Sequence, residues 1–371
     1  MKPITTNEIG WGEYKGYEGP YFRGIQGLTP VMRDDPTPLQ KIYYVITNTE
    51  GSNYSAINMY DQMILSVGAI QWAERSQYSV SDILGKICES PTASVKFAEA
   101  TTTFFQTVGV TFKRNAAGKW RFHFLDSRGE VNSVEKQQAL FLGCTGKVGS
   151  WSPEAKAYAK NWAALMANIW LDREAQKIQE DYTITHIPGF LTKYAATQLL
   201  EGSKFENLTN ADLAGWKGGI IALYMSFAAN NPSIAESGLK SHLAATSQEK
   251  WSEEWCIELA KWLTFSSKIS IYPIRYNKIA PLIDKLFGTS FPVTAAELDK
   301  WKPPSSVPHR GTEETVPDMG TIIPPVMSPV VVDVPPITIR SDDPGLITSE
   351  EKMGFLKSIL NFILRILRIK K

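Results

Sequence analysis

The sequence predicts a mainly helical α+β domain over residues 1–301, a Pro-rich linker over 302–347 and an amphipathic basic helix over 348–371. Two observations support this. Apolar residues recur at helical spacing through most of the chain between residues 37 and 300, and prolines then crowd the next segment. Hydrophobic residues make up 43% of the 371 residues and charged residues 21%, which are values typical of a globular protein with a sizeable core.

Most of the first domain is expected to be helical, with two exceptions. Residues 1–36 are rich in Gly, Pro and aromatic residues and are expected to form an irregular arm or a cleft wall. Residues 110–126 contain two short alternating runs around Asn-Ala-Ala-Gly, which predicts a β-hairpin. Long helical segments are expected at 153–181, 190–202, 211–229 and 249–266.

The C-terminal segment combines a helix start signal with a basic, apolar pattern. Thr348 and Glu351 form a capping box, and the following helix has a wide apolar face and a narrow basic strip. This helix could lie in the interface of an anionic membrane, dock into a groove of a protein assembly, or fold back onto its own domain. A transmembrane span is disfavoured because Lys357, Arg365 and Arg368 interrupt the apolar run.

Several functional classes are made improbable by composition. The net charge is +1 and the basic excess lies in residues 351–371, so the main body has no basic surface for nucleic acid. The four histidines and three cysteines have no metal-ligand spacing, so neither a metal nor an organic cofactor is expected. The first 20 residues lack the apolar core of a signal peptide, which predicts synthesis in the cytoplasm without one.

The first predicted helix ends in a glutamate that continues its buried stripe. Thr37 and Pro38 are a typical cap and first residue of a helix. From there Leu39, Ile42, Tyr43 and Ile46 mark a buried stripe, Glu50 is its next member, and Gly51 fits the residue that closes a helix.

The position of Glu50 predicts a carboxyl group that holds its proton. A buried stripe disfavours charge, and the C-terminal end of a helix carries negative partial charge. Both effects raise the pKa of a carboxyl group, as a general acid requires. The alternative is a glutamate that turns into solvent.

The residues that follow Glu50 are compatible with a glycan-cleaving site. Asp61 comes eleven positions later, and paired carboxyl groups flank the scissile bond in most glycosidases. Ser66, Gln71, Tyr60 and Trp72 offer a hydroxyl, an amide and two aromatic rings as substrate contacts. The alternatives are that Asp61 caps a turn, that Ser66 and Gln71 satisfy loop backbone, and that the two rings belong to the core.

These residues, in this order, resemble the lysozyme-like superfamily. Glu50 followed by Ser66-Val67-Gly68-Ala69-Ile70-Gln71 is similar to the core of goose-type lysozymes and lytic transglycosylases, where a glutamate at a helix end precedes a Gly-Leu-Met-Gln-like segment. The order Glu50, Asp61, Ser66 is similar to the Glu, Asp, Thr order of phage lysozymes, and Gly68-x-x-Gln71-Trp72 resembles proteins near the chitosanases. The resemblance covers residues 37–75.

The resemblance implies a peptidoglycan-cleaving enzyme, either a muramidase or a lytic transglycosylase. Glu50 would protonate the departing oxygen, and Asp61 would stabilise positive charge on the sugar or orient water. The partner would be a peptidoglycan glycan strand, reached at the bacterial cell wall after release as a phage endolysin, after injection, or as part of a phage tail or contractile injection particle. Two alternatives are a non-catalytic component of such a particle and a membrane-permeabilising toxin acting through residues 349–371.

Overall fold

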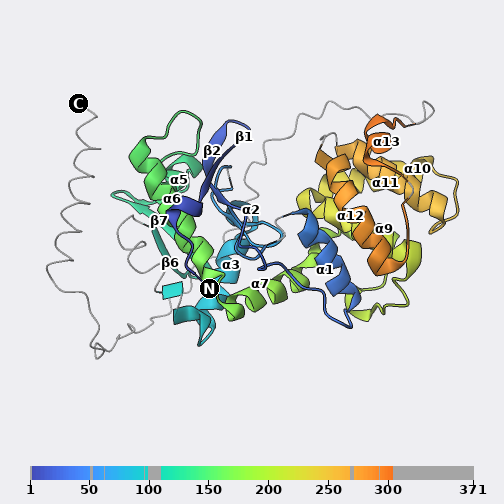
Figure 1. Cartoon of the computed structure of the whole chain (residues 1–371), viewed down its shortest axis with the longest axis horizontal. Coiled ribbons are helices and arrows are strands. Elements are labelled where there is room, and N and C mark those ends of the chain that lie inside the picture. Colours follow the sequence, from blue (N-terminus) through green and yellow to red (C-terminus); the bar gives the residue numbers. More distant parts are fainter. Residues whose placement is uncertain are drawn as a thin grey trace. The chain divides into compact units, whose positions relative to one another are not determined.

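The computed structural model describes residues 2–50, 53–61, 63–95, 97–98, 110–267, 271–291 and 293–303. Contacts divide the chain into two units, Met1–Pro308 and His309–Lys371. The predicted linker, beyond its first two residues, and the predicted C-terminal helix lie outside the described residues, and so does Gly51. Figure 1 shows the whole chain, with the helices and strands of the first unit labelled.

The described part of the first unit is mainly helical and contains two small antiparallel sheets. Its α-helices are α1 (Pro38–Thr49), α2 (Glu74–Gln77), α3 (Ser79–Glu89), α5 (Val134–Leu142), α6 (Pro153–Ile169), α7 (Arg173–His186), α8 (Lys193–Leu200), α9 (Gly215–Asn230), α10 (Pro232–Ala245), α11 (Glu253–Ser267), α12 (Ile271–Phe287) and α13 (Ala295–Lys300). Short 3-10 turns are η1 (Thr6–Glu8), η2 (Ile187–Phe190) and η3 (Phe205–Asn207). Within the described residues, no helix is both long enough and apolar enough to cross a membrane.

The start of α1 is confirmed. The Thr37 hydroxyl accepts a hydrogen bond from the Gln40 backbone N–H, and the Gln40 side chain accepts from the Thr37 backbone N–H. This reciprocal pair satisfies two amides that the first turn leaves without partners. Ile42 and Ile46 are fully buried, as the predicted stripe requires.

The expectation of an irregular arm over residues 1–36 is wrong in part. Residues 10–22 form a regular hairpin of β1 (Gly10–Tyr14) and β2 (Tyr17–Phe22). Lys15 and Gly16 between them both have positive φ, which is the two-residue turn that suits the twist of paired strands. Gly10 and Gly12 leave room for tyrosine rings and Gly19 for the Met59 backbone, so the abundance of glycine here did not indicate a loop.

The hairpin is the edge of a five-stranded antiparallel sheet in the order β1-β2-β3-β4-β5. The last three strands are short: β3 (Ile57–Asn58), β4 (Ser66–Val67) and β5 (Trp72–Ala73). A second sheet contains β6 (Val110–Arg114), β7 (Trp120–Asp126) and β8 (Gly129–Glu130). Its β6–β7 pair confirms the hairpin predicted for residues 110–126.

The predicted helical segment 153–181 is two helices instead of one. The side chain of Asp172 accepts hydrogen bonds from the backbone N–H groups of Glu174 and Ala175, so it caps α7. Local capping therefore outweighed the continuous helical pattern. The break matters because α7 carries residues that hold the first sheet.

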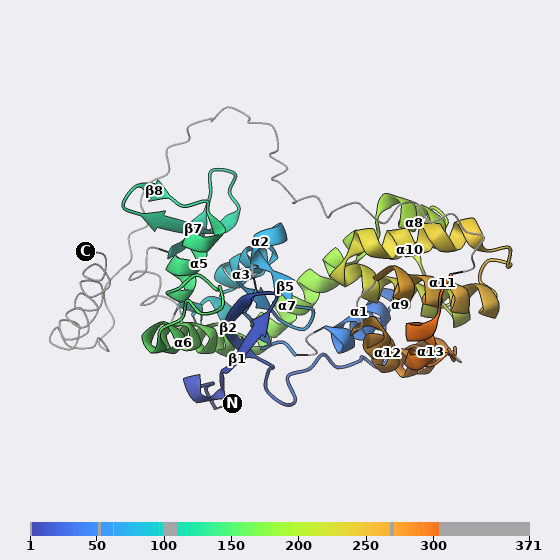
Figure 2. The ribbon, with the colours of Figure 1, turned by 90° about the horizontal axis from the view of Figure 1, so that it is seen from above.

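The helix α9 lies at the centre of the helices in the second half of the unit. It packs against α1, α10, α11 and α12, whose arrangement can be followed in Figure 2. A Cβ on Gly218 would come within 1.9 Å of the Leu213 carbonyl oxygen, so a glycine is required there. Trp162, Trp170, Trp255 and Trp262 are buried, which assigns these tryptophans to the core.

A buried histidine belongs to the same core. His242 of α10 is completely buried, and its ring meets Trp255 of α11 edge to face with centroids 4.7 Å apart. Neither ring nitrogen has a hydrogen-bond partner among the described residues. Burial therefore lowers the pKa of His242 to about 4.

The lowered pKa of His242 predicts a loss of stability in acid. Between pH 6.5 and pH 4 the unfolded chain binds a proton that the folded chain does not, so the free energy of unfolding falls as the pH falls. The loss should reach on the order of 3 kcal/mol by pH 4. Urea unfolding at several pH values measures this free energy, and between pH 6.5 and pH 4 it should fall less in His242→Leu than in the wild type. An equal fall in the two proteins would contradict the lowered pKa of His242.

Candidate functional site

Glu50 ends α1 and is bound by an arginine of α12, a helix that packs against α1 although it lies 225 positions later in the chain. Its backbone N–H donates to the Ile46 carbonyl, which closes the helix. Both carboxylate oxygens accept from the guanidinium of Arg275 in α12, through Nη1 to Oε1 and through Nη2 to Oε2 at 3.3 Å. The Glu50 side chain is only 10% exposed and the Arg275 side chain only 15%.

The environment of Glu50 combines two opposing effects on its pKa. Burial raises the pKa above the usual range, and the Arg275 guanidinium acts in the opposite direction. The net direction is upward, because desolvation is the largest cause. The expectation that Glu50 turns inward agrees with the structure, while the arginine partner had no signal in the sequence, because it lies 225 positions away.

Asp61 caps the turn that follows β3. Its carboxylate accepts from the Met63 backbone N–H at 2.8 Å and from the Asn58 side-chain amide at 3.3 Å. Burial nevertheless raises the pKa of Asp61 above its usual value, and the two hydrogen bonds oppose this rise. Asp61 therefore fills the turn-capping role that we considered as its alternative.

Ser66 lies in a strand of the first sheet, and Gln71 lies in the turn between β4 and β5. Ser66 is buried in β4, directly opposite Asn58 of β3. Gln71 donates its side-chain amide to the carbonyl oxygens of Gly68 at 3.0 Å and Ala56 at 3.4 Å. The Gln71 amide is thus used to hold the loop backbone.

The sheet is fixed to α7 by two buried side chains. Gln179 accepts from the Ala69 backbone N–H and donates to the Tyr54 carbonyl. A Cβ on Gly68 would come within 2.3 Å of this side chain, so Gly68 allows Gln179 to approach. Trp72 is 6% exposed and donates its indole N–H to the Thr183 hydroxyl, so it is a core residue and offers no open ring face.

Tyr60 is half-buried beside Asp61, on the opposite side of the sheet from Trp72. Its ring lies against Gly12 of β1 and meets the Tyr21 ring edge to face with centroids 6.0 Å apart. The structure therefore brings Tyr60, Asp61, Ser66, Gln71 and Trp72 into one sheet and its turns. Glu50 stands at the helix end that leads into this sheet, seven positions before β3 begins.

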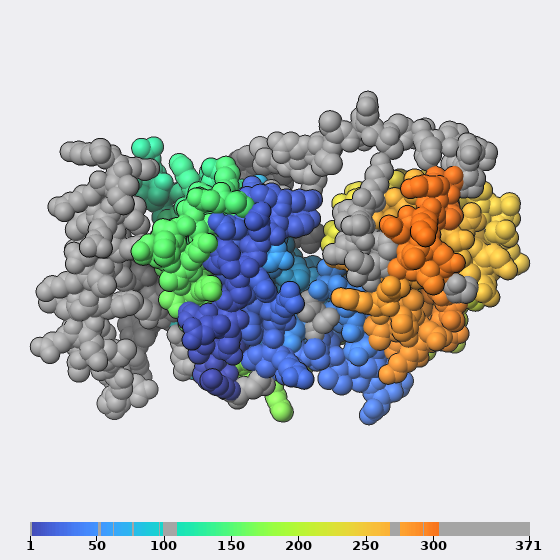
Figure 3. All heavy atoms as spheres, turned by 45° about the horizontal axis from the view of Figure 1, so that its top comes forward, coloured from blue at the N-terminus to red at the C-terminus, as the bar shows by residue number. Residues whose placement is uncertain are grey.

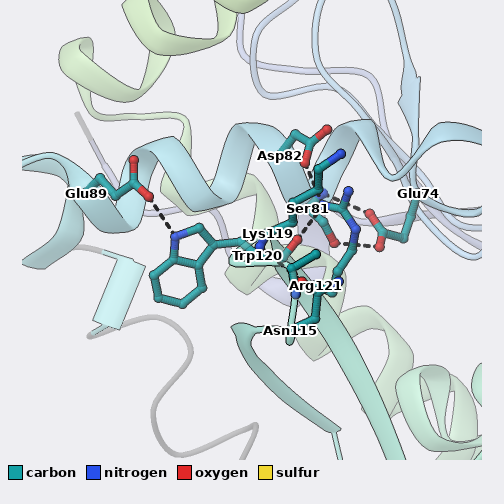
Figure 4. Close-up of polar contacts among 9 residues, drawn as sticks. Glu74, Ser81, Asp82, Glu89, Asn115, Lys119, Trp120 and Arg121 are labelled. Atoms are coloured by element: carbon teal, nitrogen blue, oxygen red, sulfur yellow. Dashed lines mark hydrogen bonds and ion pairs between the residues drawn. The ribbon is translucent and has the colours of Figure 1, made fainter. Parts of the chain in front are cut away.

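The sequence reasoning missed a third acidic residue with a raised pKa. Glu74 is buried and accepts from the backbone N–H and the hydroxyl of Ser81, at 2.8 and 2.6 Å (Figure 4). Arg121, paired with Asp82, lies in the same network. Burial raises the pKa of Glu74 to about 7, although the Ser81 hydrogen bonds favour the charged form. Because Glu74 is bonded to the first turn of α3, we assign it to the scaffold.

Comparisons with protein-family models, with curated proteins and with solved structures find no match for this chain.

The raised pKa of Glu74 predicts a pH effect opposite to that of His242. Between pH 4.5 and pH 7 the folded chain binds a proton more tightly than the unfolded chain, so stability falls as the pH rises. Glu74→Gln imitates the protonated form and should abolish a slope worth on the order of 3 kcal/mol over this range. Glu249→Gln, a change at an exposed position, is the control and should keep the pH dependence of the wild type. The prediction is contradicted if the free energy of unfolding of Glu74→Gln varies with pH as it does in the wild type.

Proposed function

We propose that this chain cleaves the glycan strands of peptidoglycan, with Glu50 as the proton donor. The observation that carries the proposal is a carboxyl group withdrawn from water at the end of α1, with its pKa raised by burial in spite of a bound arginine. A carboxyl group with a raised pKa holds its proton to a higher pH than an ordinary glutamate does, which favours proton transfer to a leaving oxygen.

The arrangement around Glu50 also supports the proposal. α1 ends in this acid, and the chain leads from it into a small antiparallel sheet. Asp61 supplies a second carboxyl group with a raised pKa in the turn after β3. It would stabilise positive charge on the sugar or orient the attacking water.

Arg275 has a defined part in this chemistry. After Glu50 gives up its proton, the carboxylate that remains is stabilised by the guanidinium. Before proton transfer, the same group holds the carboxyl in one orientation. Arg275 is therefore proposed as a positioning residue that also limits how far burial raises the pKa of Glu50.

One observation favours a second candidate, a non-catalytic component of a phage tail or contractile injection particle. The Glu50–Arg275 pair ties α1 to α12, as a purely structural ion pair would. The Gln71 amide binds the loop backbone and the Trp72 ring lies in the core. These contacts leave neither side chain free for the substrate contacts that the sequence suggested. In this case the domain would serve as a scaffold or as a glycan-binding module.

The two candidates are separated by lytic activity on purified peptidoglycan. Glu50→Gln should lower the cleavage rate by about 100-fold or more, as expected for the loss of a general acid. Arg275→Gln should lower the cleavage rate less than Glu50→Gln does, and it should shift the alkaline limb of the pH–rate profile to higher pH, because the pKa of Glu50 rises without its cation. Mass analysis of the products distinguishes hydrolysis from transglycosylation.

The control for these variants is Glu201→Gln, which removes a surface carboxylate paired with Lys217 and Lys250. It should leave the cleavage rate and the pH profile unchanged. Wild-type protein that releases no fragments at any pH, or Glu50→Gln with full activity, would refute the enzyme and leave the scaffold candidate.

A further inference from the structure

The two faces of the first sheet have different surroundings. α6 packs against β2 and β3, and the Lys156 ammonium of α6 lies 5.0 Å from the centroid of the Trp11 ring. Because side chains alternate along a strand, the residues on the side of Trp11 include Pro20, which is directly opposite it, and Phe22. Pro20 is buried and Phe22 packs against the core, so this face is covered.

The opposite face of the hairpin carries only glycine and tyrosine. By the strand register it presents three cross-strand pairs: Gly10 with Tyr21, Gly12 with Gly19, and Tyr14 with Tyr17. Tyr60, from the turn after β3, lies on the same face, against Gly12. On the side drawn in Figure 3, atoms of the N-terminal residues, in dark blue, are open to solvent.

The glycines position the rings. A Cβ on Gly10 would come within 2.6 Å of the Tyr21 ring, and a Cβ on Gly12 within 2.8 Å of the Tyr60 ring. Both rings therefore lie down over the strand backbone. Tyr14, at the end of β1, is 49% exposed, and Tyr21 and Tyr60 are half-buried. The result is an aromatic surface in which contact with the strand backbone fixes the orientations of the Tyr21 and Tyr60 rings.

Charged groups border the rings. The guanidinium of Arg23, an exposed residue, lies 5.6 Å from the centroid of the Tyr21 ring. Burial raises the pKa of Tyr60, the charge of Asp61 acts in the same direction, and the Arg23 guanidinium opposes the rise. We call Tyr14, Tyr21, Tyr60 and Arg23 the tyrosine face. It leads directly to Asp61, the residue after Tyr60.

We propose that the tyrosine face binds a glycan strand whose sugars carry carboxylate groups, as an accessory subsite of the glycan-cleaving site. The C–H face of a pyranose ring packs on a flat aromatic ring, and tyrosine hydroxyls exchange hydrogen bonds with sugar hydroxyls. Arg23 supplies the planar cation that pairs with a carboxylate. This inference rests on the proposed function and extends it to a segment outside residues 37–75.

The composition of the face favours a glycan over two other occupants. A lipid surface would require aliphatic side chains that enter the acyl region, and the hairpin presents none on this side. A second copy of the chain would require a larger apolar area with few hydroxyl groups. Three tyrosines and an arginine, next to the half-buried Asp61, fit a polar ligand with flat apolar faces.

Binding measurements on the full chain carrying Glu50→Gln, which prevents cleavage, test the proposal. The probes are an oligosaccharide that contains muramic acid and a neutral chitin oligosaccharide of equal length. Tyr14→Ala combined with Arg23→Gln should raise the Kd for the first probe by about tenfold, the scale of a lost aromatic or arginine contact. Arg23→Gln alone should abolish the preference for the acidic probe. Tyr78→Ala, which removes a tyrosine of similar exposure at 52%, is the matched control and should not change the Kd.

Each outcome decides the proposal. Weaker binding in the double variant, with an unchanged control and an unchanged melting temperature, supports it. Equal binding in the double variant and its background overturns it. Wild-type protein that cleaves peptidoglycan while the tyrosine face makes no difference refutes the subsite and leaves the proposed function standing. Wild-type protein that neither cleaves nor binds refutes the proposed function, and this inference fails with it.

Discussion

The buried pair of Glu50 and Arg275 is the constraint on which the rest of the structure depends. Removing two charges from water costs several kcal/mol for each ion, and mutual attraction offsets this cost only when the geometry is good. The guanidinium meets both carboxylate oxygens, so the pair can persist at low exposure. It joins the end of α1 to α12 and thereby determines where the chain leaves the helices and enters the first sheet.

The position of that sheet depends on a second set of buried polar contacts. Gln179 and Thr183 of α7 bind the backbone of Ala69 and the indole of Trp72, respectively. An unpaired buried polar group costs about 1–3 kcal/mol, so these contacts strongly favour one register. The position of Asp61 relative to the helices therefore depends on α7, and so on the helix start at Asp172.

Much of the local structure was predictable from the sequence, because it depends on neighbours in the chain. The cap at Thr37, the stripe through Ile42 and Ile46, and the hairpin around residues 115–118 all follow from local pattern. The N-terminal hairpin was missed because its glycines suggested a loop, whereas they accommodate rings that come from another strand and another turn. Sequence left open whether Gln71 and Trp72 contact substrate or belong to the loop and the core, because their partners, the loop carbonyls and Thr183, depend on the tertiary fold.

The site itself was predictable only in part. That Glu50 turns inward follows from helical spacing, but the identity of its cation does not, because Arg275 is brought to it by tertiary packing alone. The central claim is that this carboxyl group holds its proton more tightly than an ordinary glutamate. Carbon-13 NMR titration of the Glu50 carboxyl in the full chain tests it directly: the account predicts a midpoint above 4.5, the usual value for glutamate, and a midpoint at or below that value would contradict it.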